Sequence, residues 1–225
     1  MQLVHFSVEL EFAEKRHLPS PAKNVYRALS GKKPDKGEVV EPGAHISLSD
    51  KRVDIRWRFD RCRVILEDAS SLKRCVETVL LWLSQIDKVA PMGEIDSTKV
   101  TTCWLLPTPR YDFASLERKY REKMIVSNKD ILKGTFDCSV MFDADIGDCK
   151  LYHQSGAMEH QQLLKNYLFF KPDEVHEVFL FLLARVTNED KVEYSKGGMH
   201  KQLSALFNHC MSHSNAFDQI WKEAL

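Results

Sequence analysis

The sequence predicts an α+β protein made of two ferredoxin-like (split βαβ) units, with mainly antiparallel sheets and a helical C-terminus. Three observations support this. Residues 51–68 alternate apolar and charged side chains with the period of a half-buried strand. Residues 71–87 repeat apolar side chains at the spacing of a core-facing helix. The predicted elements run β-α-β-β-α-β and then α-β-β-β-α, the order expected if one α+β unit occurs twice.

The length of 225 residues suits one large or two small domains. We place the N-terminal α+β unit at residues 1–98 and the C-terminal unit, with the terminal helix, at residues 99–225. One continuous domain is the alternative. The 32 basic residues balance the 32 acidic ones, so the chain lacks the strongly basic character of proteins that live on nucleic acid.

The first unit begins with an alternating strand at residues 3–12. Ser20 is suited to cap a short helix that has Pro21 at its first position. Residues 32–43 are polar and contain prolines and glycines, which predicts a mobile loop. A short strand is expected at 45–48, and residues 52–66 predict one long strand or two that meet near Asp60. The helix at 71–87 and a strand at 99–106 follow.

The second unit begins with a helix capped by Asp112. Residues 136–146 and 149–154 predict a hairpin that turns at Gly147 and Asp148. Residues 175–187 are apolar on both faces, which is typical of a central strand. The chain is expected to end in a helix from Met199 that breaks within residues 212–215.

Four segments carry a resemblance to a known family. They are VHFSVELEF, the run RVILEDASSLKRCVETVLLWLSQIDKV with the later TTCWLLP, EVFLFLLARVTN, and LSALFNHCMSHSNAFDQIWKEAL. Their pattern resembles a sporadically distributed family of uncharacterised bacterial proteins with a duplicated α+β core. The resemblance implies a bacterial protein with that fold, and it supplies no activity and no site residues.

The cysteines and the N-terminus predict a soluble, cytoplasmic protein. The six cysteines form no CxxC pair, which favours reduced thiols. The first residues alternate as a strand does and do not resemble a signal peptide. The longest apolar run, residues 178–184, is much shorter than the roughly 20 residues that span a bilayer. We therefore expect no membrane contact.

A set of arginines is the first candidate site: Arg56, Arg58, Arg61 and Arg63. On an exposed sheet face they could bind an anion or an acidic partner, because guanidinium groups form paired hydrogen bonds with phosphates and carboxylates. The alternative is structural. Glu9 and Glu11 would then face Arg56 and Arg58 across neighbouring strands and stabilise the sheet.

Two further sets are candidate metal ligands. Asp143 and Asp145 share one face of a strand and could hold Mg²⁺, although aspartates are also common beside turns. His209 and His213 share one face of an unbroken helix and could bind zinc, although no third ligand is evident. Ordinary surface side chains are the alternative for both sets, and we predict no cofactor.

The C-terminal helix offers a candidate interface at Phe217, Ile220 and Trp221, because aromatic side chains are enriched at interface anchors. The alternative is packing on the protein's own sheet. The chain contains no coherent catalytic motif, so a non-catalytic binding or assembly module is the predicted function, with a protein partner or a second copy as its partner. The alternatives are a metal-dependent enzyme acting on a nucleotide or phosphate, and a weak nucleic-acid binder.

Overall fold

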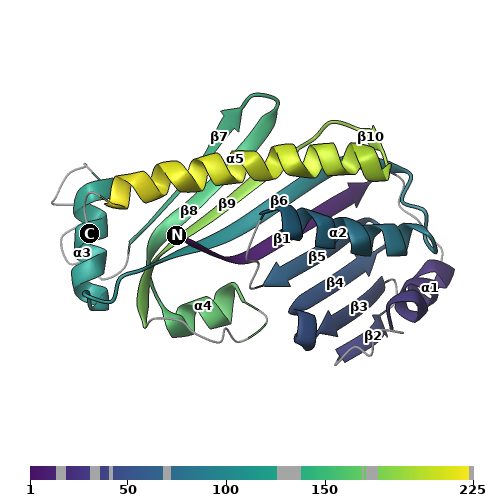
Figure 1. The fold of residues 1–225 in the computed structure, drawn as a ribbon, viewed down its shortest axis with the longest axis horizontal. Helices are drawn as coiled ribbons and strands as arrows, with labels where there is room; N and C mark the ends of the chain where they lie inside the picture. Colours follow the sequence, from purple (N-terminus) through teal and green to yellow (C-terminus); the bar gives the residue numbers. More distant parts are fainter. Residues whose placement is uncertain are drawn as a thin grey trace.

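One antiparallel sheet runs through the computed structural model (Figure 1), and helices pack on both of its faces. The structure describes residues 1–13, 19–30, 36–40, 43–67, 72–125, 138–168, 170 and 177–222. In these residues the strand order is β2-β3-β4-β5-β1-β6-β9-β8-β7, and the short β10 pairs with β6. The protein is therefore a mixed α+β protein with a helical C-terminus, as the sequence predicts.

The strands and helices have the following bounds. The strands are β1 (Gln2–Phe12), β2 (Lys36–Val40), β3 (Gly43–Leu48), β4 (Val53–Arg58), β5 (Arg61–Glu67), β6 (Glu94–Pro107), β7 (Ser139–Ile146), β8 (Cys149–Glu159), β9 (Val178–Asn188) and β10 (Val192–Glu193). The helices are α1 (Pro19–Ser30), α2 (Leu72–Asp87), α3 (Phe113–Met124), α4 (His160–Asn166) and α5 (Lys196–Lys222), with a 3-10 turn at Ser49–Lys51.

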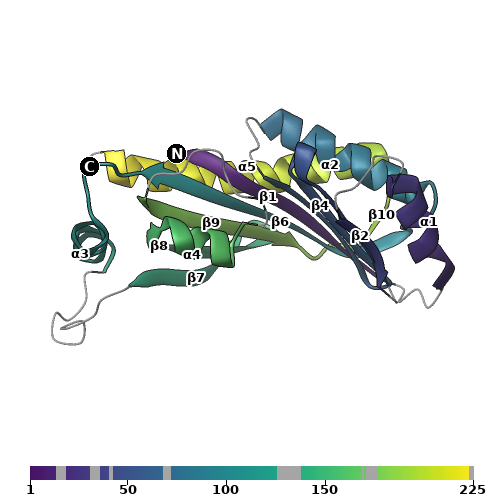
Figure 2. The ribbon, with the colours of Figure 1, turned by 90° about the horizontal axis from the view of Figure 1, so that it is seen from below.

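Helices α1, α2 and α5 cover one face of the sheet, which we call the helix face (Figure 2). Alternate strand residues point into this layer because successive side chains of a strand point to opposite faces. In β1 these are Phe6, Val8, Leu10 and Phe12, all buried. The main core therefore lies between the sheet and these three helices.

The opposite face, which we call the open face, is covered in part by α4 (Figure 2). Leu163 of α4 packs with Cys103, Leu105, Phe181 and other apolar side chains of β1, β6, β8 and β9 in a second, smaller core. Toward β5 and β4 the same face becomes polar, as the alternation in residues 51–68 predicts. The boundary between its apolar and polar parts holds the candidate site.

The two predicted ferredoxin-like units are not confirmed. In the first half, β2 to β5 form a meander without an intervening helix, and β5 returns to pair with β1. In the second half, β9 likewise returns to pair with β6. Strands β1 and β6 pair with each other, so both halves share one sheet, and residue 98 lies inside β6.

Three local expectations differ from the structure. Residues 36–40, expected within a loop, form strand β2, which pairs with β3; the rest of that loop that precedes Gly43 lies outside the described residues. Helix α4 was not expected. Helix α5 continues without a break through residues 212–215, and the buried Ser214 donates its hydroxyl to the carbonyl of Met211 in the same helix.

Candidate functional site

The strand register places a row of charged side chains across the open face. Arg56 of β4 lies opposite Arg63 of β5, and Arg63 lies opposite Glu9 of β1. Glu9 in turn lies opposite Lys99 of β6. The predicted pairing of Glu9 and Glu11 with Arg56 and Arg58 is therefore wrong. Strand β5 lies between β1 and β4, so Glu9 and Glu11 face Arg63 and Arg61 instead.

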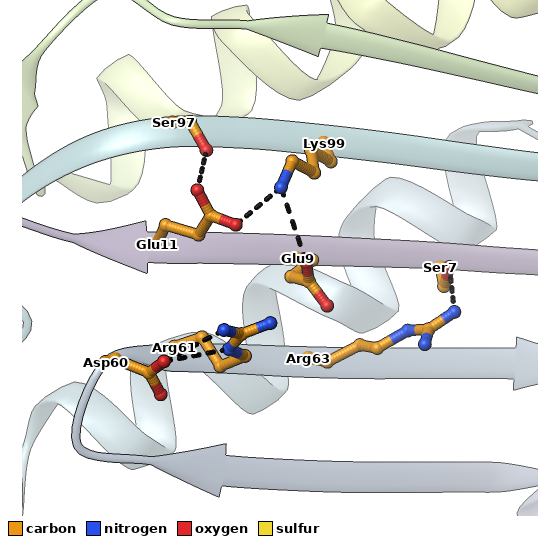
Figure 3. A network of polar contacts seen from close by, with 8 residues as sticks. All are labelled: Ser7, Glu9, Glu11, Asp60, Arg61, Arg63, Ser97 and Lys99. Atoms are coloured by element: carbon orange, nitrogen blue, oxygen red, sulfur yellow. Dashed lines mark hydrogen bonds and ion pairs between the residues drawn. The ribbon is translucent and has the colours of Figure 1, made fainter. Parts of the chain in front are cut away.

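Several of these charges neutralise one another (Figure 3). Lys99 donates a hydrogen bond to Glu11 and lies 3.7 Å from Glu9, and Ser97 also donates to Glu11. Burial opposes ionisation of Glu11, but these hydrogen bonds and the Lys99 charge outweigh it and lower the pKa of Glu11. Arg61 donates to Asp60 at 2.9 and 3.1 Å, which lowers the pKa of that carboxyl group.

Arg63 differs from these neighbours because it makes no ion pair among the described residues. Its Nη2 lies 3.5 Å from Ser7 Oγ, a weak contact that turns the side chain toward β1 (Figure 3). Burial lowers the pKa of Arg63. The Glu9 charge opposes this shift, whereas the Arg56 and Arg185 charges add to it. The protein therefore holds a partly buried guanidinium beside other guanidinium groups.

Arg63 lines a cavity of about 440 Å³ on the open face, which we call the open-face cavity. Its cationic end is formed by Arg63, Thr101 of β6 and Arg185 of β9. Thr101 and Arg185 lie opposite each other in the register, and Ser7 is the partner of Thr101 on β1. The Ser7 contact therefore brings the Arg63 guanidinium beside the row that contains Arg185.

The second arginine of the cavity, Arg185, also makes no ion pair within the described residues. Its guanidinium carbon lies 5.3 Å from the centre of the Tyr152 ring, the distance of a cation–π contact. Tyr152 also lines the cavity and lies opposite Arg185 on β8. Arg185 is exposed, so its charge is available to a ligand that enters from solvent.

The other end of the cavity carries amide and aromatic side chains. Gln154 of β8, Asn166 of α4 and Tyr167, which directly follows α4, line it. Tyr167 packs on Phe181 with ring centres 4.5 Å apart. Burial raises the pKa of Tyr167, so its hydroxyl stays protonated and can donate a hydrogen bond.

The floor between the two ends includes His5 of β1, Cys103 of β6 and Leu183 of β9. His5 is buried, and its Nδ1 lies 3.5 Å from Glu67 Oε1 but makes no hydrogen bond among the described residues. Burial raises the pKa of the Cys103 thiol well above its usual value, and the Glu67 charge adds to the shift. Cys103 is therefore a neutral thiol, which is a weak nucleophile.

Of the four arginines expected to form the site, only Arg63 lines the cavity. Arg56 donates to Asp54 at 2.9 Å, and Arg61 bonds to Asp60. Arg58 is exposed at the end of β4. Arg185, Tyr152, Gln154 and Asn166 were missed, because their segments come together with Arg63 only through strand pairing that the local sequence does not reveal.

Neither pair of candidate metal ligands belongs to a larger group of ligands in the described residues. Asp143 and Asp145 are exposed on β7, opposite Tyr152 and Lys150. His209 is exposed on α5, whereas His213 bonds to His153 of β8, with 2.6 Å between His153 Nδ1 and His213 Nε2. In the described parts of the chain, no group of three or more His, Cys, Asp or Glu side chains is placed to hold a metal ion.

The candidate interface residues on α5 lie mostly inside the molecule. Trp221 is fully buried and stacks on Tyr120 of α3 with ring centres 5.6 Å apart, and Phe217 is also buried. These two side chains pack on the protein's own elements, which was the alternative reading. Only Ile220 is exposed, at 41% of its surface.

Comparison with protein-family models and with curated proteins finds no match to this chain. The family resemblance therefore stays a prediction from the sequence. Among the helices that the structure describes, none combines the length and apolar character needed to cross a membrane.

Proposed function

We propose that the protein is a binding module that holds a small anionic molecule in the open-face cavity. The observation that supports this is the convergence of Arg63 and Arg185 on that cavity, where neither has a carboxylate partner among the described residues. Two neighbouring guanidinium groups repel each other, and burial of Arg63 adds a desolvation cost. A bound anion offsets both penalties.

The chemistry of the cationic end suits a phosphate or carboxylate group. Guanidinium forks donate paired hydrogen bonds to such oxygens, and a hydroxyl such as that of Thr101 can add another. The cavity volume of about 440 Å³ lies within the range of small-molecule pockets, roughly 300–1,000 Å³. By contrast, Arg56 and Arg61 already bond to carboxylates, which makes them poorer anion ligands.

The proposal is tested by following thermal unfolding with pyrophosphate as the probe, in buffers of equal ionic strength. We expect the unfolding midpoint to rise with pyrophosphate concentration, because a ligand that binds only the folded state stabilises it. Arg63→Ala and Arg185→Ala should each weaken binding about tenfold or more, because a hydrogen bond to a charged group contributes about 1.5–3 kcal/mol.

Arg58→Ala is the matched control, because Arg58 is an exposed arginine on the same face that does not line the cavity. It should leave the effect of pyrophosphate unchanged. No rise in the midpoint of the wild type, or an equal rise in the wild type and both cavity variants, would exclude this site.

A further inference from the structure

We infer that the open-face cavity takes a nucleoside monophosphate, with the phosphate at Arg63 and Arg185 and the base beside Gln154 and Asn166. This inference rests on the proposed function and specifies its ligand. It is supported by the different chemistry of the two ends of the cavity, by the Asn166 amide that is available at the amide end, and by the distance between the ends.

The two ends lie on different rows of the sheet. Thr101, Arg185 and Tyr152 form one row, and Cys103, Leu183 and Gln154 form the next. Arg63 lies opposite Glu9 in a third row. This row is next to the row of Arg185, on the side away from Gln154. Neighbouring rows on one face are two residues apart along each strand, roughly 7 Å. The ligand therefore needs a charged group at one end and a neutral, polar group about one to two rows away.

The amide end suits the edge of a nucleobase. A side-chain amide offers both a donor and an acceptor, which is the combination that the edges of nucleobases present. Asn166 is exposed at the end of α4 and makes no side-chain hydrogen bond within the described residues. Gln154 accepts a long contact of 3.4 Å from the Tyr152 hydroxyl, and its side chain also forms a hydrogen bond with Tyr167 that acts to lower the pKa of that phenol. The amide of Asn166 can therefore turn toward a ligand, and Gln154 lines the same end of the cavity.

The surfaces beside the amide end suit a planar ring. Leu183 contributes an apolar side chain, and the Tyr152 and Tyr167 rings contribute aromatic surface. Aromatic side chains stack on bases with little preference for one base over another. A simple phosphate would leave this part of the cavity without a partner, whereas the base of a nucleotide covers it.

The test compares inorganic phosphate, ribose 5-phosphate and the monophosphates of adenosine, guanosine, cytidine and uridine by isothermal titration calorimetry. We expect at least one nucleotide to bind about tenfold or more tightly than ribose 5-phosphate. This is the gain in affinity expected from one stacked base. That preference should disappear in Asn166→Ala and in Gln154→Leu. Gln161→Ala is the control, since it removes another exposed amide of α4 that does not line the cavity.

The possible results separate this inference from the function on which it rests. Equal binding of ribose 5-phosphate and all four nucleotides, lost in Arg185→Ala, would overturn the inferred ligand and leave anion binding intact. A nucleotide preference that survives both amide variants would also overturn it, because the base would then lie elsewhere. No binding of any of these compounds, together with no effect of pyrophosphate, would overturn both proposals.

Discussion

His153 is held by hydrogen bonds on both ring nitrogens. Its Nδ1 lies 2.6 Å from His213 Nε2, and its Nε2 lies 2.6 Å from Ser155 Oγ, which also bonds to the Tyr120 hydroxyl at 2.7 Å. Phe142 of β7 stacks on the imidazole with ring centres 4.5 Å apart. Burial lowers the pKa of His153 from 6.5 to about 4, and the nearby His213 adds to this shift. The folded protein therefore keeps His153 neutral near neutral pH.

This shift predicts a loss of stability in acid. Below about pH 6.5 the unfolded chain takes up a proton at this imidazole, whereas the folded protein resists doing so until about pH 4. The stability due to neutral His153 is therefore complete above about pH 6.5 and is lost as the pH falls toward 4. In His153→Gln, the free energy of unfolding from urea denaturation should fall less steeply across this range.

His209→Gln is the control for the acid effect, because His209 is exposed on the same helix as His213. Its unfolding free energy should follow the wild-type pH profile. Parallel profiles for the wild type and His153→Gln would show that His153 does not contribute to acid sensitivity.

Single residues were harder to interpret from the sequence than the strands and helices that contain them. His209 and His213 are neighbours on a helix, yet the partner of His213 is His153, which is 60 residues away. The charged face of residues 51–68 was predicted, and Arg63 does line the cavity. That Arg63 lacks a carboxylate partner could not be predicted. It depends on the position of Glu9, which lies beside Lys99 of the neighbouring strand β6.

The end of α5 joins the terminal helix to α3. Trp221 is fully buried and lies nearly parallel to the Tyr120 ring, with 8° between the ring planes. Loss of such a side chain leaves a cavity, and large-to-small substitutions of buried aromatic residues cost about 3–5 kcal/mol. Trp221→Ala should therefore lower the free energy of unfolding by about this amount, as measured by chemical denaturation.

Ile220→Ala is the matched substitution, because Ile220 is adjacent on the same helix but exposed. We expect it to change the unfolding free energy by no more than about 0.5 kcal/mol, as is usual for surface substitutions. Similar losses in the two variants would show that this end of α5 is not packed as described.

Long periodic elements were predictable, and short ones were not. The strand at 3–12, the helix at 71–87 and the helix capped by Asp112 agree with β1, α2 and α3, and Asp112 does accept a hydrogen bond from the Ser115 amide at 2.7 Å. Strand β2 and helix α4 are too short to give a clear period. The predicted break in α5 relied on polar residues, but Ser214 bonds within the intact helix and His213 bonds to His153 of β8.

At the scale of the whole molecule, the two halves share both a sheet and a helical layer. Strand β1 pairs with β6, and Phe207 of α5 packs on Phe6 of β1 with ring centres 5.3 Å apart. Both side chains are completely buried. The core of the first half is therefore closed by a helix from the second half.

This arrangement predicts that the two halves do not fold independently. A fragment of residues 1–98 loses α5 and most of β6, so it should show no cooperative thermal unfolding by circular dichroism. The intact chain in the same buffer should unfold cooperatively, because both halves contribute side chains to one core. A fragment that unfolds cooperatively near the wild-type temperature would instead support two separate units.

The mixed α+β class could be predicted from the sequence because it depends on local periodicity. The union of both halves in one sheet could not, because the pairing of β1 with β6 joins segments that are roughly 90 residues apart and leaves no local pattern. A cytoplasmic location and a protein partner stay predictions.

Strand β7 lies at one end of the described strand order and pairs only with β8. An edge strand carries backbone groups that can pair with a strand of another molecule, which is a route to aggregation. Asp143 and Asp145 are exposed on this strand. If the β7 strands of two copies lay side by side, these carboxylates would be brought close together, and like charges on neighbouring strands destabilise a sheet. The two aspartates can thus protect this edge of the sheet from pairing with a second copy.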